Sequence, residues 1–294
     1  MEANLDAMAS PGAFKEDSPY RKALRAFVKN KVAFPSFVFL VGIVLATTFA
    51  GVLTPYDPYQ GNIANRLQPV GASGHLLGTD EQGRDMLTRI LYGGRLTLLA
   101  GFVPVVVSSL IGGTLGLAAG YFGGWLNTVI MRTLDIFYAF PAVILSLGIS
   151  AALGQGMTNI IIAITIVFIP PVARVTETAV KRIRGREFIE AARSSGAGHL
   201  SIIRYQVVPN VFPQVFVFAT TKISLGIVIA AGLSFLGLGV NPPTPEWGIM
   251  LNNIKQMIFV KPVLTIVPGI FLFLTSLTIN LCSDGVSDAM QIKA

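Results

Sequence analysis

A polar segment between two long apolar stretches holds the charged residues that are best placed to contact another protein. Glu187 and Glu190 fall in the first turn of a predicted short helix and Arg193 in its last turn, so each sign of charge meets the favourable end of the helix macrodipole. Gly185 precedes this helix and Gly196 follows it, and glycine is common where helices stop. The pattern predicts a short helix exposed to water.

One face of this predicted helix carries mostly small side chains. At helical spacing four residues share it: Phe188, Ala191, Ala192 and Ser195. Small side chains let another protein approach the backbone closely, as when a helix inserts into a groove. We therefore expect a docking helix, and the alternative is a connector at the membrane surface whose small residues have no partner.

No spacing of side chains in the sequence indicates catalysis. The pattern G-x-x-x-x-G-K-[ST] is absent, so the chain lacks that phosphate-binding loop. His75 and His199 are far apart and no H-E-x-x-H occurs, so neither a metal site nor a metalloprotease is indicated. We expect a protein with no catalytic residues, no metal and no cofactor of its own.

Three charged residues fall inside apolar stretches and are candidates for a translocation path: Arg132, Asp135 and Lys222. Ionisable residues within membrane spans are costly, so each is a functional candidate by default. Arg132 and Asp135 are three residues apart and could instead pair as a structural clamp on one helix face. Lys222 could instead extend its ammonium group toward the interface.

Composition places the chain among polytopic membrane proteins. Only 13% of its 294 residues are charged, 52% are hydrophobic, and the mean hydropathy is +0.66. The formal net charge of +7 could indicate nucleic acid. However, the basic residues cluster beside apolar stretches, which favours anionic membrane lipid as their partner and argues against nucleic acid.

The apolar stretches predict an all-α protein with six transmembrane helices. The expected spans are about 34–53, 96–120, 127–153, 158–173, 211–236 and 263–281. Residues 1–33 are expected to form a cytoplasmic tail with an amphipathic helix, 34–289 the six-helix domain with a polar loop at about 185–210, and 290–294 a cytoplasmic tail. Fifteen Lys or Arg would then lie inside and six outside, which favours cytoplasmic N and C termini.

Three features within these spans carry further expectations. Gly112, Gly116 and Gly120 recur at four-residue spacing and predict close helix packing. Pro141 is expected to bend the helix of the third span. Trp247 begins a helical pattern between spans five and six, and we expect it to anchor an interfacial helix at membrane level.

The polar loop resembles the EAA loop of the membrane subunits of ATP-binding-cassette importers. Glu190-Ala191-Ala192 is followed after three residues by Gly196, and Pro209 lies thirteen positions further on. Gln206 and Val208 depart from the isoleucine and leucine that are general in the family. The resemblance implies that Glu187, Phe188, Glu190, Ala191, Ala192 and Gly196 form a coupling helix that seats in a cleft of a cytoplasmic ATPase.

Three further segments resemble the second, C-type membrane subunit of importers for dipeptides, oligopeptides or nickel. They are residues 78–95, 233–250 and 280–289. The first contains an outer-loop motif made of Asp80, Arg84, Asp85 and Arg89. After Met290 the chain departs from the family, having Gln291-Ile292 where Asp-Pro is frequent.

The resemblance implies the type I importer permease fold in a bacterial plasma membrane. Its implied partners are a homologous B-type permease subunit, two cytoplasmic ATPases that bind ATP and magnesium, and an extracytoplasmic substrate-binding protein. The alternative function is an ion-coupled secondary transporter, which would use buried carboxylates at the middle of its spans. No acidic residue lies at the middle of a predicted span, which counts against it.

Overall fold

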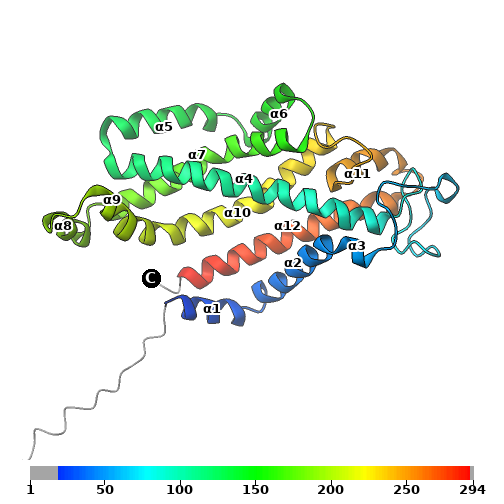
Figure 1. The fold of residues 1–294 in the computed structure, drawn as a ribbon, viewed down its shortest axis with the longest axis horizontal. Helices are drawn as coiled ribbons and strands as arrows, with labels where there is room; N and C mark the ends of the chain where they lie inside the picture. Colours follow the sequence, from blue (N-terminus) through cyan, green and yellow to red (C-terminus); the bar gives the residue numbers. More distant parts are fainter. Residues whose placement is uncertain (1–18, 292–294) are drawn as a thin grey trace, which may run out of the picture.

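The computed structural model describes residues 19–291, in which every regular element is helical and no β-strand occurs. Residues 1–18 and 292–294, which include most of both predicted tails, lie outside the described residues. The helices are α1 (Pro19–Lys29), α2 (Ala33–Thr48), α3 (Ala50–Leu53), α4 (Met86–Phe122), α5 (Gly124–Tyr138), α6 (Ala142–Leu153), α7 (Met157–Ile183), α8 (Glu187–Ser194), α9 (His199–Ile202), α10 (Val208–Phe235), α11 (Trp247–Ile254) and α12 (Pro262–Gln291). Figure 1 shows the long helices side by side.

Up to six membrane spans can be counted among the described residues. Four continuous helical runs are long and apolar enough to cross a bilayer: 86–122, 157–183, 199–235 and 262–290. Two bent pairs, α1 with α2 and α5 with α6, complete the six if each pair is one span. The prediction of an all-α polytopic fold is confirmed.

The third predicted span bends at Pro141, as expected, but the helix is interrupted there. α5 and α6 are separate helices that meet at an angle of 86°. Pro141 is the residue preceding α6, and Phe140 before it lies outside both helices. Proline lacks the N–H that would continue the ladder and disfavours helical conformation at the preceding residue, so the chain turns instead of bending gently.

The glycine face of α4 makes the close helix packing that was predicted, and the structure shows that its partner is α7. All three of its glycines are buried. A Cβ atom added at Gly112 would lie 2.6 Å from the Ile169 carbonyl oxygen, and one at Gly120 would lie 2.8 Å from Val180 Cβ. Absent side chains therefore allow the two backbones to approach closely, which is how helices associate where lipid provides no hydrophobic drive.

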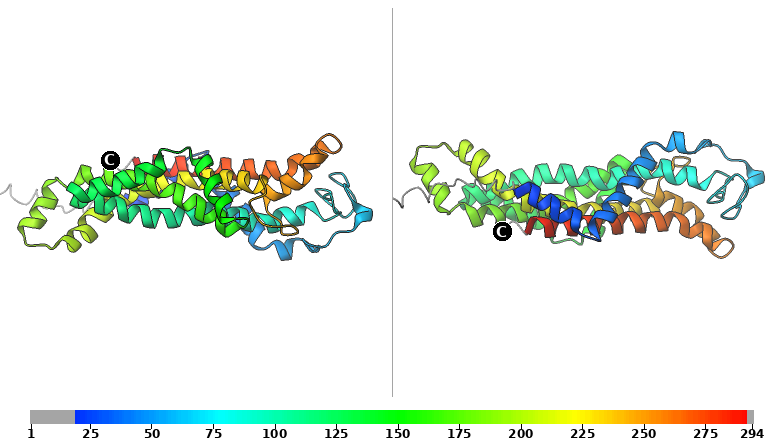
Figure 2. Two further views of the ribbon diagram at one scale, coloured as in Figure 1. Left: turned by 90° about the horizontal axis from the view of Figure 1, so that it is seen from above. Right: turned by 90° about the horizontal axis from the view of Figure 1, so that it is seen from below.

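The molecule has two distinct ends, joined by α4. The loop end comprises residues 54–85 and 236–261, and the α8 end comprises α8 and α9 with residues 195–198 between them. Figure 2 shows both ends projecting beyond the helical bundle in opposite directions. α4 runs from one end to the other, so a movement at one end can be passed along this helix to the other end.

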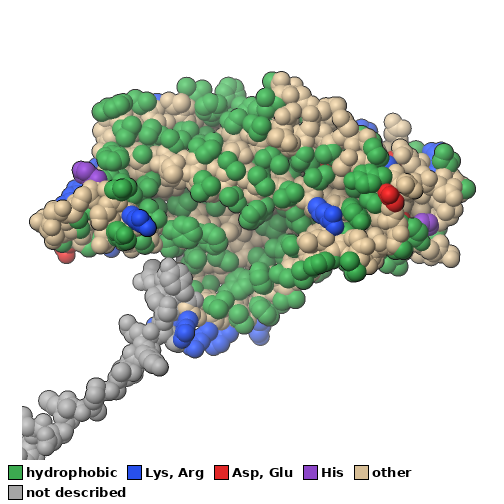
Figure 3. Space-filling model, in the orientation of Figure 1, with side chains coloured by type: hydrophobic (Ala, Val, Ile, Leu, Met, Phe, Trp, Pro, Cys, Tyr) green, Lys and Arg blue, Asp and Glu red, His purple; other side chains and the backbone are tan. Residues whose placement is uncertain are grey.

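The surface between the ends is largely apolar. Figure 3 shows hydrophobic side chains over the middle of the molecule and a group of Lys and Arg side chains beside α1. α1 is bent by 89° from α2 and carries the basic residues Arg21, Lys22, Arg25 and Lys29. An apolar belt with basic residues at its edge is what a bilayer and its anionic headgroups require.

Candidate functional site

The α8 helix has the predicted position and ends. It spans Glu187–Ser194, with two acidic residues in its first turn and Arg193 in its last. Gly196 follows with φ of +80°, a conformation that favours glycine. The Gly196 N–H donates to the Arg193 oxygen at 2.9 Å, and the Ala197 N–H donates to the Ala192 oxygen at 3.0 Å. This pair of bonds is a Schellman stop, which fixes the end of α8.

Apolar contacts of Ile189 and Ala192 hold α8 against the rest of the molecule. Ile189 is fully buried and packs in a core cluster with residues of α4, α7, α9, α10 and the π-helical segment Ile203–Val207: Tyr121, Ala179, Val180, Ile202, Val207 and Val211. Ala192 packs against the same cluster. The predicted small-residue face is therefore divided, because Ala192 turns partly inward while Phe188, Ala191 and Ser195 remain exposed.

The outward side of α8 presents charge and apolar surface together. Glu187 and Glu190 are exposed, and neither has an ion pair within residues 19–291. Phe188 is 38% exposed. Aromatic side chains such as Phe188 are enriched in protein interfaces, and charged side chains such as these glutamates suit the polar rim around them.

Two contacts at the α8 end were not predicted from the sequence. The Tyr121 hydroxyl lies 3.0 Å from His199 Nδ1, and the Arg193 guanidinium carbon lies 5.7 Å from the centre of the Tyr121 ring. Residues 199–207 are also helical, because α9 and a π-turn at Ile203–Val207 lead directly into α10. The second half of the predicted polar loop is thus the start of the fifth span.

The four residues of the predicted outer-loop motif lie together at the loop end. Asp80 Oδ2 lies 2.7 Å from Arg84 Nε and 3.2 Å from Arg89 Nε. Its other oxygen accepts the backbone N–H groups of Gln82 at 2.9 Å and of Arg84 at 3.0 Å. Asp85 caps α4 by accepting the Thr88 N–H at 2.8 Å. Buried charges require such partners, and here the chain supplies most of them itself, although Arg84 Nη1 and Arg89 Nε donate no hydrogen bond within the described residues.

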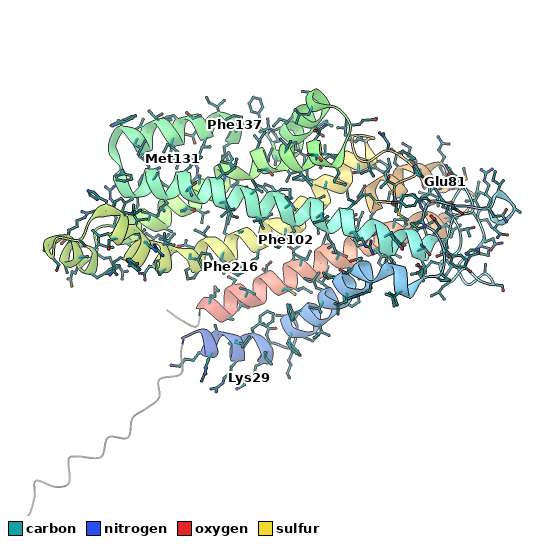
Figure 4. The ribbon with its side chains drawn as sticks, viewed as in Figure 1. Lys29, Glu81, Phe102, Met131, Phe137 and Phe216 are labelled. Carbon is teal, nitrogen blue, oxygen red and sulfur yellow. The ribbon has the colours of Figure 1, made fainter. Side chains whose placement is uncertain are left out.

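This ion cluster holds two segments together that are far apart in sequence. Arg89 Nη1 donates to the carbonyl oxygens of Pro58 at 2.7 Å and of Pro243 at 3.0 Å. Asp85 also lies 2.9 Å from His75 Nδ1. Burial, helped by the neighbouring Asp80 charge, raises the pKa of Glu81. Figure 4 shows Glu81 at this end, distant from Phe216 on α10. Buried ion pairs and hydrogen bonds therefore hold the loop end together, and we call this part of the molecule the frame.

The prediction for Trp247 was wrong. Its side chain is fully buried, and its Nε1–H donates to the Ile90 oxygen at 2.8 Å. Glu246 precedes it and caps α11 by accepting the N–H groups of Gly248 at 2.8 Å and Ile249 at 3.0 Å. Thr97 of α4 donates to Glu246 at 3.1 Å. Burial raises the pKa of Glu246, and these bonds offset part of the rise. The tryptophan thus locks α11 to α4.

The candidate path residues occupy two different settings. Asp135 forms an ion pair with Arg174 of α7, whereas Arg132 lies 4.0 Å from Asp135 and is 82% exposed. Asp135 therefore pairs with Arg132 on its own helix, as predicted, and also joins α5 to α7 through Arg174, which was not predicted. Lys222 on α10 is half-buried, and its Nζ lies 4.7 Å from the centre of the Phe218 ring.

Sequence profiles match both parts of the chain. Residues 112–292 match the profile of the binding-protein-dependent transport system inner membrane component. Residues 18–69 match that of the N-terminal TM domain of oligopeptide transport permease C.

Full-length relatives are similar along nearly the whole chain. The glutathione transport system permease protein GsiD of Pectobacterium atrosepticum is 39% identical over 276 residues, covering 94% of this chain and 92% of that protein. The di/tripeptide transport system permease protein DppC of Pseudomonas aeruginosa is 40% identical, covering 100% and 98%. The dipeptide transport system permease protein DppC of Alkalihalophilus pseudofirmus is 40% identical, covering 94% and 90%.

Solved structures share the fold. The MetNI methionine ABC transporter, in an inward-facing conformation, has a chain that matches with a TM-score of 0.57 and 21% identity, covering 70% of this chain and 97% of that one. A chain of an amino acid ABC transporter matches with a TM-score of 0.52 and 18% identity, covering 69% and 92%.

Proposed function

The chain belongs to the family of binding-protein-dependent transport system inner membrane components, and we propose that it forms half of the translocation path of an importer for short peptides. The named cargo of the relatives, dipeptides, tripeptides and glutathione, supports a small peptide or related solute. Family membership also sets aside the ion-coupled secondary transporter. ATP and magnesium would be bound by partner subunits, because the sequence has no phosphate-binding loop of the G-x-x-x-x-G-K-[ST] type.

The observation that carries this proposal is the arrangement of α8. Its inward residue Ile189 is locked in a core, while Glu187, Phe188, Glu190 and Ala191 project outward. Such a helix can be displaced as a rigid unit by an ATPase that closes on ATP. ATP binding would then bias the membrane unit between two forms through its different contacts with each.

Bulky substitutions at α8 test this role. Glu190→Trp should block seating in the ATPase cleft, and Gly196→Leu should disrupt the Schellman stop because its φ is +80°. Both variants should lose ATP-dependent uptake of dialanine or glutathione and bind the ATPase weakly while inserting normally in the membrane. Val52→Trp, an exposed position on α3, is the matched control. Undiminished uptake by Glu190→Trp would sink the coupling role.

This chain has an apolar groove in which a second membrane subunit would fit. Apolar side chains of α1, α2, α4, α10 and α12 line a groove of about 1300 Å³, among them Phe37, Val44, Phe102, Ile223 and Val286. Figure 4 labels Phe102 on α4, one of the helices that line this groove. We assign the groove to the homologous permease, because members of this family work in pairs. Phe102→Asp should prevent co-purification with that subunit; loss of bound lipid with retained pairing would contradict the assignment.

The α8 end would lie in the cytoplasm and the loop end outside, where a substrate-binding protein would dock. The basic α1, near the α8 end of α12, then lies at the inner lipid surface with both termini inside. Leu200→Cys and Phe259→Cys, each in a Cys282→Ser chain, test this topology. An impermeant maleimide applied to spheroplasts should label position 259 alone; labelling of position 200 alone would reverse the orientation.

Lys222 remains the candidate for contact with cargo, since Asp135 already has a partner in Arg174. A half-buried ammonium on a spanning helix would attract the carboxylate end of a peptide. Lys222→Met should slow uptake without weakening ATPase binding. Uptake at the wild-type rate would exclude this contact.

A further inference from the structure

The long helix α4 is fastened at both of its ends. Its 37 residues correspond to about 55 Å at the rise of an α-helix. At the loop end Asp85 caps it and Arg89 ties it to Pro58 and Pro243. At the other end Arg184, from the segment after α7, donates to the Gly120 oxygen at 3.1 Å. Pro104 lies inside α4, but the helix continues through it from one end to the other. A displacement applied to its last turn can therefore pass along it to the loop end.

Tyr121, in that last turn, is the residue of α4 that contacts both short helices of the α8 end. Its ring is buried, and Arg193 of α8 lies over it. Its hydroxyl is bonded to His199, the first residue of α9. The His199 ring also stands edge-on to the Tyr121 ring, with centres 5.7 Å apart.

We infer that Tyr121 is a positioning residue that transmits the movement of α8 and α9 to α4 through its hydrogen bond to His199. This rests on the proposed role of α8. The contacts that Ile189 and Ala192 of α8 and Ile202 of α9 make with the core are apolar, and the His199 ring also lies against the Phe122 ring. Such contacts are non-directional and allow sliding. A hydrogen bond is directional, so it fixes the register between α9 and the end of α4.

The bond is separable from the packing around it. Phenylalanine at position 121 would keep the ring in the core and beneath Arg193, and would lose only the hydroxyl. Because His199 is exposed, its replacement leaves no cavity in the core. Glutamine at position 199 retains an acceptor of similar reach, whereas leucine does not.

The test uses the complete complex with its ATPases and second membrane subunit in proteoliposomes, with dialanine and glutathione as cargo probes. Tyr121→Phe and His199→Leu should each lower the cargo moved per ATP hydrolysed by about fivefold or more, the low end of allosteric coupling. ATP hydrolysis and the thermal midpoint should change little. The double variant should be no worse than either single variant, and His199→Gln should restore part of the loss. Tyr59→Phe, an exposed hydroxyl at the loop end, is the matched control.

Two outcomes overturn the inference: an unchanged ratio of cargo to ATP in both single variants, or losses that add in the double variant. The comparison with Glu190→Trp separates this from failure of the proposed function. If Glu190→Trp abolishes uptake while Tyr121→Phe keeps the wild-type ratio, the positioning role alone is wrong. If Glu190→Trp retains uptake, the coupling role of α8 is wrong.

Discussion

The loop end and the α8 end both carry charged residues, but they use them in opposite ways. At the loop end Asp80, Arg84 and Arg89 are buried and bonded to one another and to backbone carbonyls. At the α8 end Glu187 and Glu190 are exposed and have no ion pair within residues 19–291. Charges paired inside the chain stabilise a frame, whereas exposed charges without an ion pair on a short helix are available to a partner.

The difference between the two ends should appear most strongly in the free energy of unfolding of variants. Arg89→Ala leaves Asp80 buried with one fewer partner and frees two backbone carbonyls, so we expect a loss of about 3–5 kcal/mol in the free energy of unfolding. Arg132→Ala, which removes an 82% exposed arginine, is the matched control and should change little. Unfolding of the purified protein in detergent measures both. Equal stability of the two variants would remove the distinction between frame and surface.

A pH dependence should belong to the loop end. Burial raises the pKa of Glu246 above its ordinary value of 4.5, so the folded state holds this proton more tightly than the unfolded state. The stability that the protonated Glu246 side chain contributes is fully present below pH 4.5 and is lost as the pH rises through its folded pKa. The loss in the free energy of unfolding is about 1.4 kcal/mol for each unit by which the folded pKa exceeds the unfolded one. Glu246→Gln should lack this slope in unfolding measurements from about pH 4 to about pH 8. A variant with the wild-type slope would contradict it.

The smallest effect on stability is expected at α8. Glu187→Gln should change the free energy of unfolding by less than about 0.5 kcal/mol, as for most surface substitutions. It should instead slow association with the ATPase and reduce the salt dependence of that association. Binding kinetics at several ionic strengths measure this. A large loss of stability with unchanged association would place Glu187 in the frame.

The position of α8 could be predicted because its signals are local in sequence. The contacts at the loop end were harder to predict because they join residues that are far apart in sequence. The ends of α8 follow from Gly185, Gly196 and the charges between them, all within twelve residues. The prediction for Trp247 was wrong because its hydrogen-bond partner Ile90 lies 157 residues away, and no residue near the tryptophan in sequence indicates that it is buried. The pairing of Asp135 with Arg174, 39 residues apart, and the contact of Tyr121 with His199 were hidden for the same reason.

Crosslinking from two exposed phenylalanines tests the central claim most directly. Phe188 on α8 is 38% exposed, and Phe259 at the loop end is 95% exposed. A photoreactive benzoylphenylalanine can replace either ring in the assembled transporter. We predict that irradiation joins position 188, and not position 259, to the ATPase. A crosslink to the ATPase from position 259 with none from position 188 would contradict the assignment of the two ends.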